Sequence, residues 1–264
     1  MTLQLLISTM YQDNPTEFLK KMSIQSDCIV INQCNVDSES EFKYNGYKIL
    51  WINSTKRGLS CSRNMAIKRA TADICVLSDD DLVYCDNYKD KIIHAFEGIS
   101  DASVIRFEIE GIEQVFKSYP SERIRCGYVK SMKASSVEIA FKRCDIVDND
   151  ISFDECIGAG TEFLMGEENA FLFSCLRKKL KMYFEPQLIA KLHIGDSSWF
   201  KGYNDDYFIG RGAAFAAMSE RFSWFLVSQF ALRKYHIYKK ENSFFNSIKL
   251  MFKGVKQYKK KSKY

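Results

Sequence analysis

Three consecutive carboxylates, Asp79-Asp80-Asp81, follow the apolar residues 74–77. Adjacent carboxylates repel one another and are costly to bury, so a cluster at the end of an apolar strand implies a cation or a set of donors beside it. Oxygen ligands in small number suit Mg²⁺ or Mn²⁺ that holds a diphosphate, because these ions keep positions open for phosphate oxygens. The alternative is a solvated acidic turn that caps the next helix.

A second feature, residues 57–64, joins a glycine turn to the start of a helix. Free backbone N–H groups at a helix start, together with the forked guanidinium of Arg63, can meet a phosphate or the edge of a nucleobase. This segment therefore fits the same diphosphate chemistry as the Asp triplet.

A third feature places two carboxylates, Glu167 and Glu168, after the glycine-containing residues 158–166. A carboxylate at a helix N-terminus behind a flexible loop is a candidate general base for deprotonating a hydroxyl nucleophile. In the alternative interpretation, the two acids only complement the helix dipole.

The elements around these residues predict an α/β fold. Short apolar runs alternate with helix-like segments through the first half of the chain, which is typical of a parallel sheet. Ligands bind such sheets beyond the carboxyl ends of the strands, where the Asp triplet lies. We expect strands over residues 3–8, 28–32, 49–52, 74–77, 104–108 and 137–141 and near Val129, and helices over residues 16–22, 59–70, 87–96, 167–180 and 204–238, the last as one or two helices.

The composition is that of a globular protein with one large domain. The 264 residues are 46% hydrophobic and 27% charged, which excludes a disordered chain, a fibrous repeat and a coiled coil. The nine Cys form no CxxC pair, so neither a disulfide framework nor a zinc cluster is expected, and a reducing cytoplasm fits. No run reaches the roughly 18 apolar residues of a bilayer span, and the first residues lack the charged head of a signal peptide.

Charge is unevenly distributed along the chain. Residues 233–264 hold eleven Lys or Arg against the acid Glu241, a net charge of +10, whereas the first 232 residues hold 27 basic and 32 acidic side chains, a net charge of −5. Because aromatic residues lie between the lysines at roughly helical spacing, we expect this tail to lie on an anionic membrane surface and not to bind nucleic acid. The alternative is a helix that packs its aromatic side chains on the protein. Residues 222–232 stay open to burial on the protein, on a second subunit or in lipid, and the oligomeric state is open.

Taken in order, four segments resemble those of one enzyme family. They are Ser8-Thr9-Met10 at a strand end, the Gly-Leu-Ser-x-Ser-Arg-Asn segment 58–64, the Asp-rich residues 78–81 and the Gly-Glu-Glu residues 166–168. The combination resembles glycosyltransferase family 2 over about residues 3–200, and it is similar to the bacterial branch that builds capsular and other surface polysaccharides. The resemblance implies a GT-A fold, which is a Rossmann-like mixed sheet flanked by helices. We expect a catalytic domain over residues 1–203 and a C-terminal helical extension over residues 204–264.

The resemblance also assigns residues to a nucleotide-sugar site. The residues that match this site are Ser8, Thr9, Met10, Asn32, Gln33, Arg63, Asp79 and Asp80. The first three would form the floor under the nucleobase, and the next two are alternative contacts to its edge. Arg63 matches the arginine near the nucleotide, Asp79 would touch the ribose and Asp80 the metal.

The resemblance gives the metal and the acceptor further residues. Asp81 is the alternative metal ligand, because three consecutive Asp leave the register open, and His193 lies where some relatives supply a histidine to the metal or diphosphate. In the alternative interpretation, His193 is a structural side chain at a strand end. Gly160 and Trp199 are assigned to the acceptor, with a core tryptophan as the alternative for Trp199.

The implied reaction is a single displacement with inversion. The base that matches is Glu168, with Glu167 as the alternative, since the family pattern is Glu-Asp and this chain has Glu-Glu. The donor would be a nucleotide-sugar, most often a UDP-sugar, with Mn²⁺ or Mg²⁺ as cofactor. The acceptor would be a lipid-linked saccharide at the cytoplasmic face of the membrane, to which the enzyme binds peripherally. Two rival functions are a nucleotidyltransferase, although the N-terminus has no glycine-rich, lysine-bearing loop, and a non-catalytic module that binds the nucleotide-sugar.

Overall fold

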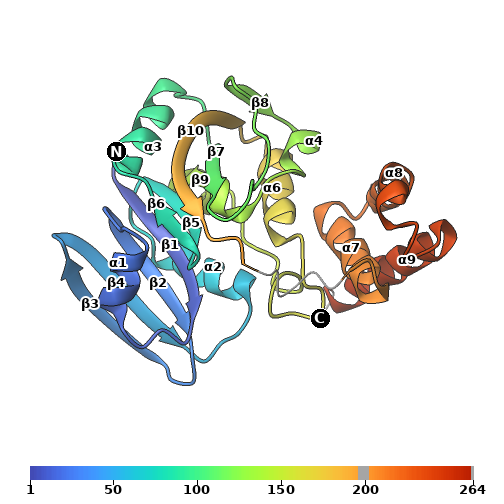
Figure 1. Ribbon diagram of the computed structural model, residues 1–264, viewed down its shortest axis with the longest axis horizontal. Coiled ribbons are helices and arrows are strands. Elements are labelled where there is room, and N and C mark those ends of the chain that lie inside the picture. Colours follow the sequence, from blue (N-terminus) through green and yellow to red (C-terminus); the bar gives the residue numbers. More distant parts are fainter. Residues whose placement is uncertain (196–201, 263–264) are drawn as a thin grey trace. The chain divides into compact units, whose positions relative to one another are not determined.

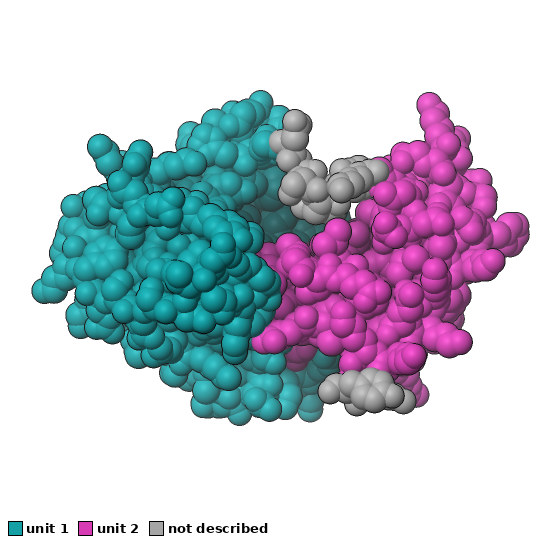
Figure 2. Space-filling view, turned by 90° about the horizontal axis from the view of Figure 1, so that it is seen from below, with its two compact units in different colours: residues 1–57, 61–152, 175–195 teal, residues 58–60, 153–174, 196–264 magenta. Residues whose placement is uncertain are grey.

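The computed structural model describes residues 1–195 and 202–262 of the chain (Figure 1). The chain divides into two compact units, which Figure 2 shows in separate colours. Unit 1 comprises Met1–Arg57, Cys61–Ser152 and Cys175–Gly195, and unit 2 comprises Gly58–Ser60, Phe153–Ser174 and Asp196–Tyr264. The division into a catalytic domain over residues 1–203 and a C-terminal helical extension over residues 204–264 stays a prediction.

Unit 1 is built on a parallel sheet whose strands are almost continuous apolar runs. These strands are β1 (Leu3–Met10), β2 (Asp27–Gln33), β4 (Tyr47–Ser54) and β5 (Ile74–Asp79), in the order β4-β2-β1-β5. Side chains such as Leu5, Val30 and Val76 are fully buried, as expected for a parallel sheet covered on both faces. The strands predicted over residues 3–8, 28–32, 49–52 and 74–77 are confirmed.

The register of these strands brings their carboxyl ends to one edge of the sheet. Ser8 pairs with Ile31 on one side and with Asp79 on the other, and Thr9 pairs with Asn32. Polar side chains that are far apart in the sequence therefore meet at this edge, where open α/β sheets bind ligands.

Strands of mixed direction extend the sheet. Its order is β3-β4-β2-β1-β5-β9-β7-β10-β6, with β8 paired to β10. The added strands are β3 (Ser38–Tyr44), β6 (Leu82–Tyr84), β7 (Val104–Gly111), β8 (Ile124–Cys126), β9 (Ile139–Lys142) and β10 (Met182–Leu192). β7 is parallel to β10, whereas β3, β6, β8 and β9 are antiparallel to their neighbours. The mixed sheet flanked by helices confirms the predicted fold class.

Sequence reasoning missed β3, β6 and β10 and placed one strand wrongly. Val129 lies in the short helix α4 (Tyr128–Ser131), and the strand of this region is β8. The segment predicted as a strand over residues 137–141 begins as a 3₁₀ turn, η1 (Ser136–Glu138), and then becomes β9. β3 was missed because its sequence, SESEFKY, is mostly exposed and carries no apolar run; its pairing with β4 makes it a strand.

Helices α1 (Pro15–Lys21) and α3 (Tyr88–Gly98) contribute apolar side chains to the core of unit 1. The Asn14 side chain caps α1 by accepting a hydrogen bond from the backbone N–H of Glu17 at 3.2 Å, and Pro15 occupies the first helical position. Phe18 of α1 packs edge-on against Trp51 of β4. Helix α5 (Arg143–Val147) follows β9, and helices α2 (Leu59–Arg69) and α6 (Glu167–Arg177) each begin in unit 2 and end in unit 1.

Three further helices belong to unit 2, namely α7 (Asp205–Met218), α8 (Ser223–Tyr238) and α9 (Phe244–Lys261). The segment predicted as one or two helices over residues 204–238 is thus two helices, α7 and α8. None of the helices in the described part of the chain is long and apolar enough to cross a bilayer.

Helices α7 and α9 are in backbone contact through two glycines. A Cβ atom on Gly212 would lie 1.9 Å from the carbonyl oxygen of Met251, and a Cβ atom on Gly254 would lie 1.9 Å from that of Ile209. The face of α9 that carries Met251 and Gly254 is buried in this contact. For this face, the structure favours the alternative in which the tail packs on the protein.

Candidate active site

Two hydroxyl groups at the end of β1 anchor the candidate site. Ser8 Oγ lies 2.8 Å from Ser62 Oγ of α2, inside unit 1, and Thr9 Oγ1 donates to Asp80 Oδ2 at 2.5 Å. Both serine side chains are buried. The residues predicted as the floor of a nucleobase site therefore connect β1 with α2 and with the Asp triplet. Met10, the last residue of β1, is half exposed.

Asp79 has its partners inside unit 1. Arg63 Nη2 donates to Asp79 Oδ1 at 3.1 Å, and Ser136 Oγ of η1 donates to Asp79 Oδ2 at 3.2 Å. The Arg63 side chain is 1% exposed, whereas that of Asp79 is 27% exposed. A buried guanidinium thus holds a carboxylate that still reaches solvent, and Ser136 is a contributor that sequence reasoning missed.

Asp81 differs from its neighbours, because its Oδ1 atom is buried and has no hydrogen-bond partner within the described chain. Burial, and after it the charges of Asp79 and Asp80, together raise the pKa of this carboxyl from 3.8 to about 7. A buried oxygen with no donor is unusual in a folded protein and requires an explanation. A cation beside it would supply one.

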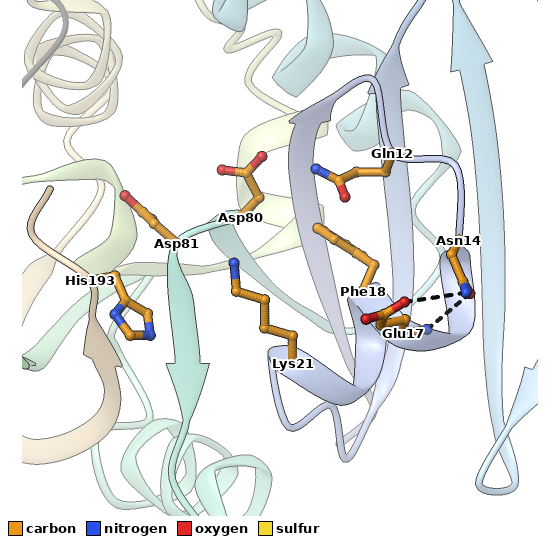
Figure 3. A pocket seen from close by; sticks show the side chains of 8 residues that line it. All are labelled: Gln12, Asn14, Glu17, Phe18, Lys21, Asp80, Asp81 and His193. Carbon is orange, nitrogen blue, oxygen red and sulfur yellow. Dashed lines mark hydrogen bonds between the residues drawn. The ribbon is translucent and has the colours of Figure 1, made fainter.

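A cavity of about 380 Å³ opens beside the Asp triplet (Figure 3). Its lining residues, all in unit 1, are Gln12, Asn14, Glu17, Phe18, Lys21, Asp80, Asp81 and His193. The three residues predicted as metal ligands, Asp80, Asp81 and His193, therefore line one cavity. The lining residues from α1 and from the loop before it were missed, because no charge cluster or glycine pattern marks residues 12–21.

His193 is fixed by Glu113. Its Nδ1 atom lies 2.8 Å from Glu113 Oε1, and Glu113 Oε2 accepts a hydrogen bond from the backbone N–H of Ile194 at 2.7 Å. These bonds hold the pKa of Glu113 below its usual value, with the bond to His193 as the larger cause. The backbone N–H of His193 also donates to the carbonyl of Asp81 at 2.9 Å. A carboxylate on Nδ1 leaves Nε2 for a ligand, as in many metal-binding histidines.

The two residues predicted to contact a nucleobase edge, Asn32 and Gln33, are both buried. Asn32 Nδ2 donates to the Gln12 carbonyl and to Asn53 Oδ1, and its Oδ1 accepts from the Gln12 N–H. Asn32 therefore holds the loop between β1 and α1. Gln33 is buried and pairs with Met10 in the sheet.

An aromatic and basic cluster lies after β1, β2 and β4, and sequence reasoning missed it. Tyr11 is 55% exposed and has a φ of 51°, which is costly for a side chain of this size. Arg57 Nη2 donates to Tyr11 Oη at 3.3 Å and to Asn35 Oδ1 at 3.0 Å. The guanidinium carbon lies 5.7 Å from the centroid of the Tyr11 ring. An exposed aromatic ring on a strained backbone, beside a guanidinium, suits a stacked base. The positive φ of Tyr11 could not be predicted from the sequence.

The candidate base belongs to unit 2. Glu167 and Glu168 open α6 after Gly166, which has a φ of 89°. Glu167 is buried, and its side chain comes within 3.0 Å of where a Cβ on Gly158 would stand, whereas Glu168 is half-buried. Of the two acids, Glu168 is therefore more accessible to an acceptor hydroxyl.

The two residues predicted for the acceptor have different outcomes. Gly160, also in unit 2, has a φ of 84°, and a Cβ on it would lie 3.0 Å from Gly58 Cα. The position therefore requires glycine for its backbone conformation, and a role in acceptor binding stays a prediction. Trp199 lies outside the described residues.

The carboxylates beside the cavity provide some of the oxygen ligands that a hard cation needs, but not a full set among the described residues. Among residues 1–195 and 202–262, no three His, Cys, Asp or Glu side chains form a group that could hold a metal ion. Mg²⁺ is commonly held by one or two carboxylates plus substrate phosphates, so Asp80 and Asp81 fit an ion that arrives with a diphosphate. The orphaned Asp81 Oδ1 is the observation that supports this fit.

Comparison with known proteins identifies the fold. Residues 26–151 match the model of glycosyl transferase family 2. The structure of S. aureus TarS 1-349 is similar with a TM-score of 0.64 at 14% identity, covering 97% of this chain and 81% of that one. The complex of S. aureus TarS 1-349 with UDP-GlcNAc is similar with a TM-score of 0.62 at 15% identity, covering 91% and 74%. No curated protein matches the sequence significantly. The GT-A fold predicted from the sequence is confirmed.

Proposed function

We propose that the chain is a glycosyltransferase of family 2, whose model matches residues 26–151, and that it transfers a sugar from a nucleotide-sugar to a hydroxyl of a lipid-linked saccharide in surface polysaccharide synthesis. The alignment of strand ends in unit 1 carries this proposal, because it brings Thr9, Asp79, Asp80 and Asp81 to one edge of the sheet. That edge is where α/β sheets bind nucleotides.

The donor would enter with its base over the cluster of Tyr11, Arg57 and Asn35. The exposed ring of Tyr11 offers a stacking surface, and Asp79, held by Arg63, offers a carboxylate to the ribose hydroxyls. A UDP-sugar is the donor we favour, because the similar TarS structures include complexes with UDP-GlcNAc and with UDP. Ser8, Thr9 and Met10 would support the base from β1.

The diphosphate would lie beside the cavity at the Asp triplet. Asp80 and Asp81 would hold Mn²⁺ or Mg²⁺ there, and His193, oriented by Glu113, would contact the ion or the diphosphate. When bound, such an ion neutralises the charge that grows on the leaving diphosphate. Lys21, on the cavity wall, offers a positive charge to the same group.

The chemical step would be a single displacement that inverts the anomeric carbon. Glu168 takes the proton of the acceptor hydroxyl, the acceptor oxygen forms a bond to the anomeric carbon, and the bond from that carbon to the diphosphate breaks on the opposite face. The nucleoside diphosphate leaves with the electron pair. Glu167 is the alternative base, and Gly160 and Trp199 would contact the acceptor.

The acceptor would be reached from the cytoplasmic face of a membrane. The net charge of +10 over residues 233–264 supports this placement, since an anionic leaflet attracts basic segments.

Two substitutions test the function. Glu168→Gln should keep metal-dependent UDP binding and lower turnover roughly 10²- to 10⁴-fold, because general-base catalysis has about that magnitude. Asp80→Asn should abolish metal-dependent UDP binding, which a thermal shift measures. Glu162→Gln and Asp86→Asn serve as matched controls that should change neither quantity.

The products of the same assay exclude the rival functions. Release of UDP together with a glycosylated acceptor supports sugar transfer, whereas release of inorganic pyrophosphate would indicate a nucleotidyltransferase. Binding of UDP-sugar with no product from any acceptor, and no effect of Glu168→Gln, would indicate a non-catalytic binding module.

A further inference from the structure

Helix α8 of unit 2 is apolar on two faces. Leu226, Val227 and Ala231 lie on its buried face. Other apolar side chains of the same helix are exposed, and among them Trp224 is 57% and Leu232 69% exposed. Large apolar side chains that gather on an exposed surface mark an interaction site, and these side chains lack a cover within the described chain.

The outer surface holds two groups of ring contacts, one at the start of α8 and one that joins the last turns of α8 to the start of α9. Trp224 and Phe225 contact each other with ring centroids 6.0 Å apart, and Phe225 is 55% exposed. Further along α8, Tyr235 contacts Phe244 at 5.6 Å, and Phe244 contacts Phe245 at 5.5 Å. Phe245 is 82% exposed. We call the exposed set Trp224, Phe225, Leu232, Tyr235 and Phe245 the aromatic face.

Basic side chains border the aromatic face. Arg233, Lys234, Lys239 and Lys240 are exposed on α8 and just after it, and Lys249, Lys253 and Lys256 are exposed along α9. The neighbouring acid Glu241 accepts a hydrogen bond from the backbone N–H of Tyr203. Aromatic rings flanked by lysine and arginine are the side chains that membrane interfaces favour, because the rings lie at the headgroup level and the cations meet anionic lipid.

The apolar face of α9 is not available for the same purpose. Its close contact with α7 at Gly212 and Gly254 leaves no room for lipid. The tail would therefore reach a membrane through the aromatic face and not through the apolar face of α9 that its helical periodicity indicates.

We propose that the aromatic face of α8 and of the first turn of α9 lies in the interface of an anionic lipid bilayer, with the flanking lysines among the headgroups. This inference rests on the proposed function in one respect, because it names the surface with which the enzyme would meet a lipid-linked acceptor. Charge complementarity favours lipid over a second copy of the chain, since a twofold contact would bring two sets of these cations together.

Vesicle binding by the full chain tests the proposal. The chain should sediment with vesicles of phosphatidylcholine and phosphatidylglycerol, and binding should weaken at least tenfold with phosphatidylcholine alone. The triple variant Trp224→Ser, Phe225→Ser, Leu232→Ser should bind the anionic vesicles at least tenfold more weakly. Val115→Ser, which changes an 87% exposed side chain of unit 1, is the matched control and should bind normally.

Fluorescence gives a second readout. In a chain that carries Trp199→Phe, brominated lipids should quench part of the tryptophan emission, and adding Trp224→Phe should remove that quenching while vesicle binding persists; Trp51, which is buried, stays unquenched. Equal binding of the triple variant, or no binding of the parent chain to anionic vesicles, would overturn the proposal. Self-association of the parent chain in sedimentation velocity, lost in the triple variant, would overturn it in favour of a second copy.

Activity separates this inference from the proposed function. The triple variant should turn over a water-soluble saccharide acceptor at the parent rate. If the parent chain transfers no sugar yet its vesicle binding depends on the aromatic face, the proposed function fails and the lipid surface stands. If sugar transfer occurs without vesicle binding, the lipid surface fails and the proposed function stands.

Discussion

Two buried carboxylates of unit 1 have opposite environments. Glu138 of η1 is fully buried and accepts hydrogen bonds from Arg106 Nε at 3.0 Å and from the Tyr119 hydroxyl at 3.1 Å, and it forms a salt bridge with Lys117. Asp81 is largely buried, yet its Oδ1 atom has no partner among the described residues. One carboxylate has its charge balanced within the protein, and the other does not.

The difference indicates which acid is structural. Leaving a buried acceptor without a donor costs roughly 1–3 kcal/mol, and Glu138 shows that this sequence supplies donors where a carboxylate serves the fold. The turn η1 that carries Glu138 also carries Ser136, which donates a hydrogen bond to Asp79. The hydrogen-bonded cluster around Glu138 therefore supports the end of β5, two residues before Asp81. We infer that Asp81 is left for a ligand.

The largest expected effect is on the balanced acid. Glu138→Gln leaves the buried Arg106 and the partly buried Lys117 without their counter-charge, so it should lower the free energy of unfolding by roughly 3–5 kcal/mol. Urea unfolding measures this loss. Glu110→Gln, which removes an exposed pair with Lys191, is the control and should change stability by less than about 0.5 kcal/mol. An equally small effect of Glu138→Gln would show that the cluster contributes nothing.

A smaller effect of opposite sign is expected at the unbalanced acid. The pKa of Asp81 is about 7 in the folded protein and 3.8 when unperturbed, so the native state binds the proton more tightly and stability falls as pH rises from about 4 through 7. Asp81→Asn should remove this loss and stabilise the free protein by about 2 kcal/mol at pH 8, after allowance for solvent screening.

Thermal unfolding between pH 4 and pH 9 measures the difference between the parent and Asp81→Asn. The gain should vanish at pH 4 and grow toward pH 8. Asp73 provides a control, because hydrogen bonds from Thr2 hold its pKa below 3.8. The stability that Asp73→Asn removes is present above about pH 4 and is lost only below it, so the effect of this substitution should stay nearly constant over the measured range. A gain for Asp81→Asn that is independent of pH would contradict the assignment.

The smallest effect is expected at Ser136, which lies on η1 with Glu138 and bonds Asp79 of the Asp triplet. Ser136→Ala removes one hydrogen bond to Asp79 and should cost about 1 kcal/mol of stability. Because Arg63 still holds Asp79, UDP affinity should fall only a few-fold in calorimetry. A complete loss of UDP binding would mean that Ser136, and not Arg63, sets the position of this carboxylate.

The sequence predicted the parts of the site that follow directly from strand ends. An apolar run followed by three Asp predicts a buried strand with the triplet at its carboxyl end, and this prediction needs no knowledge of contacts elsewhere in the chain. Tyr11, Arg57 and Glu113 were missed, because their positions depend on a left-handed backbone, a loop register and a long-range pairing with His193. Periodicity reports none of these. It also misplaced the strand near Val129, where β-branched and aromatic residues lie in a single turn of helix.

The contact between Gly212 and Gly254 has a consequence for synthesis of the chain. Helix α7 emerges from the ribosome before α9, and at about 5–20 residues per second the interval lasts seconds. During that interval the face of α7 at Gly212 lacks its contact with α9, and the α8 residues of the aromatic face are exposed as well. A nascent chain paused at this stage presents two apolar surfaces to chaperones, and arrival of Gly254 closes the first.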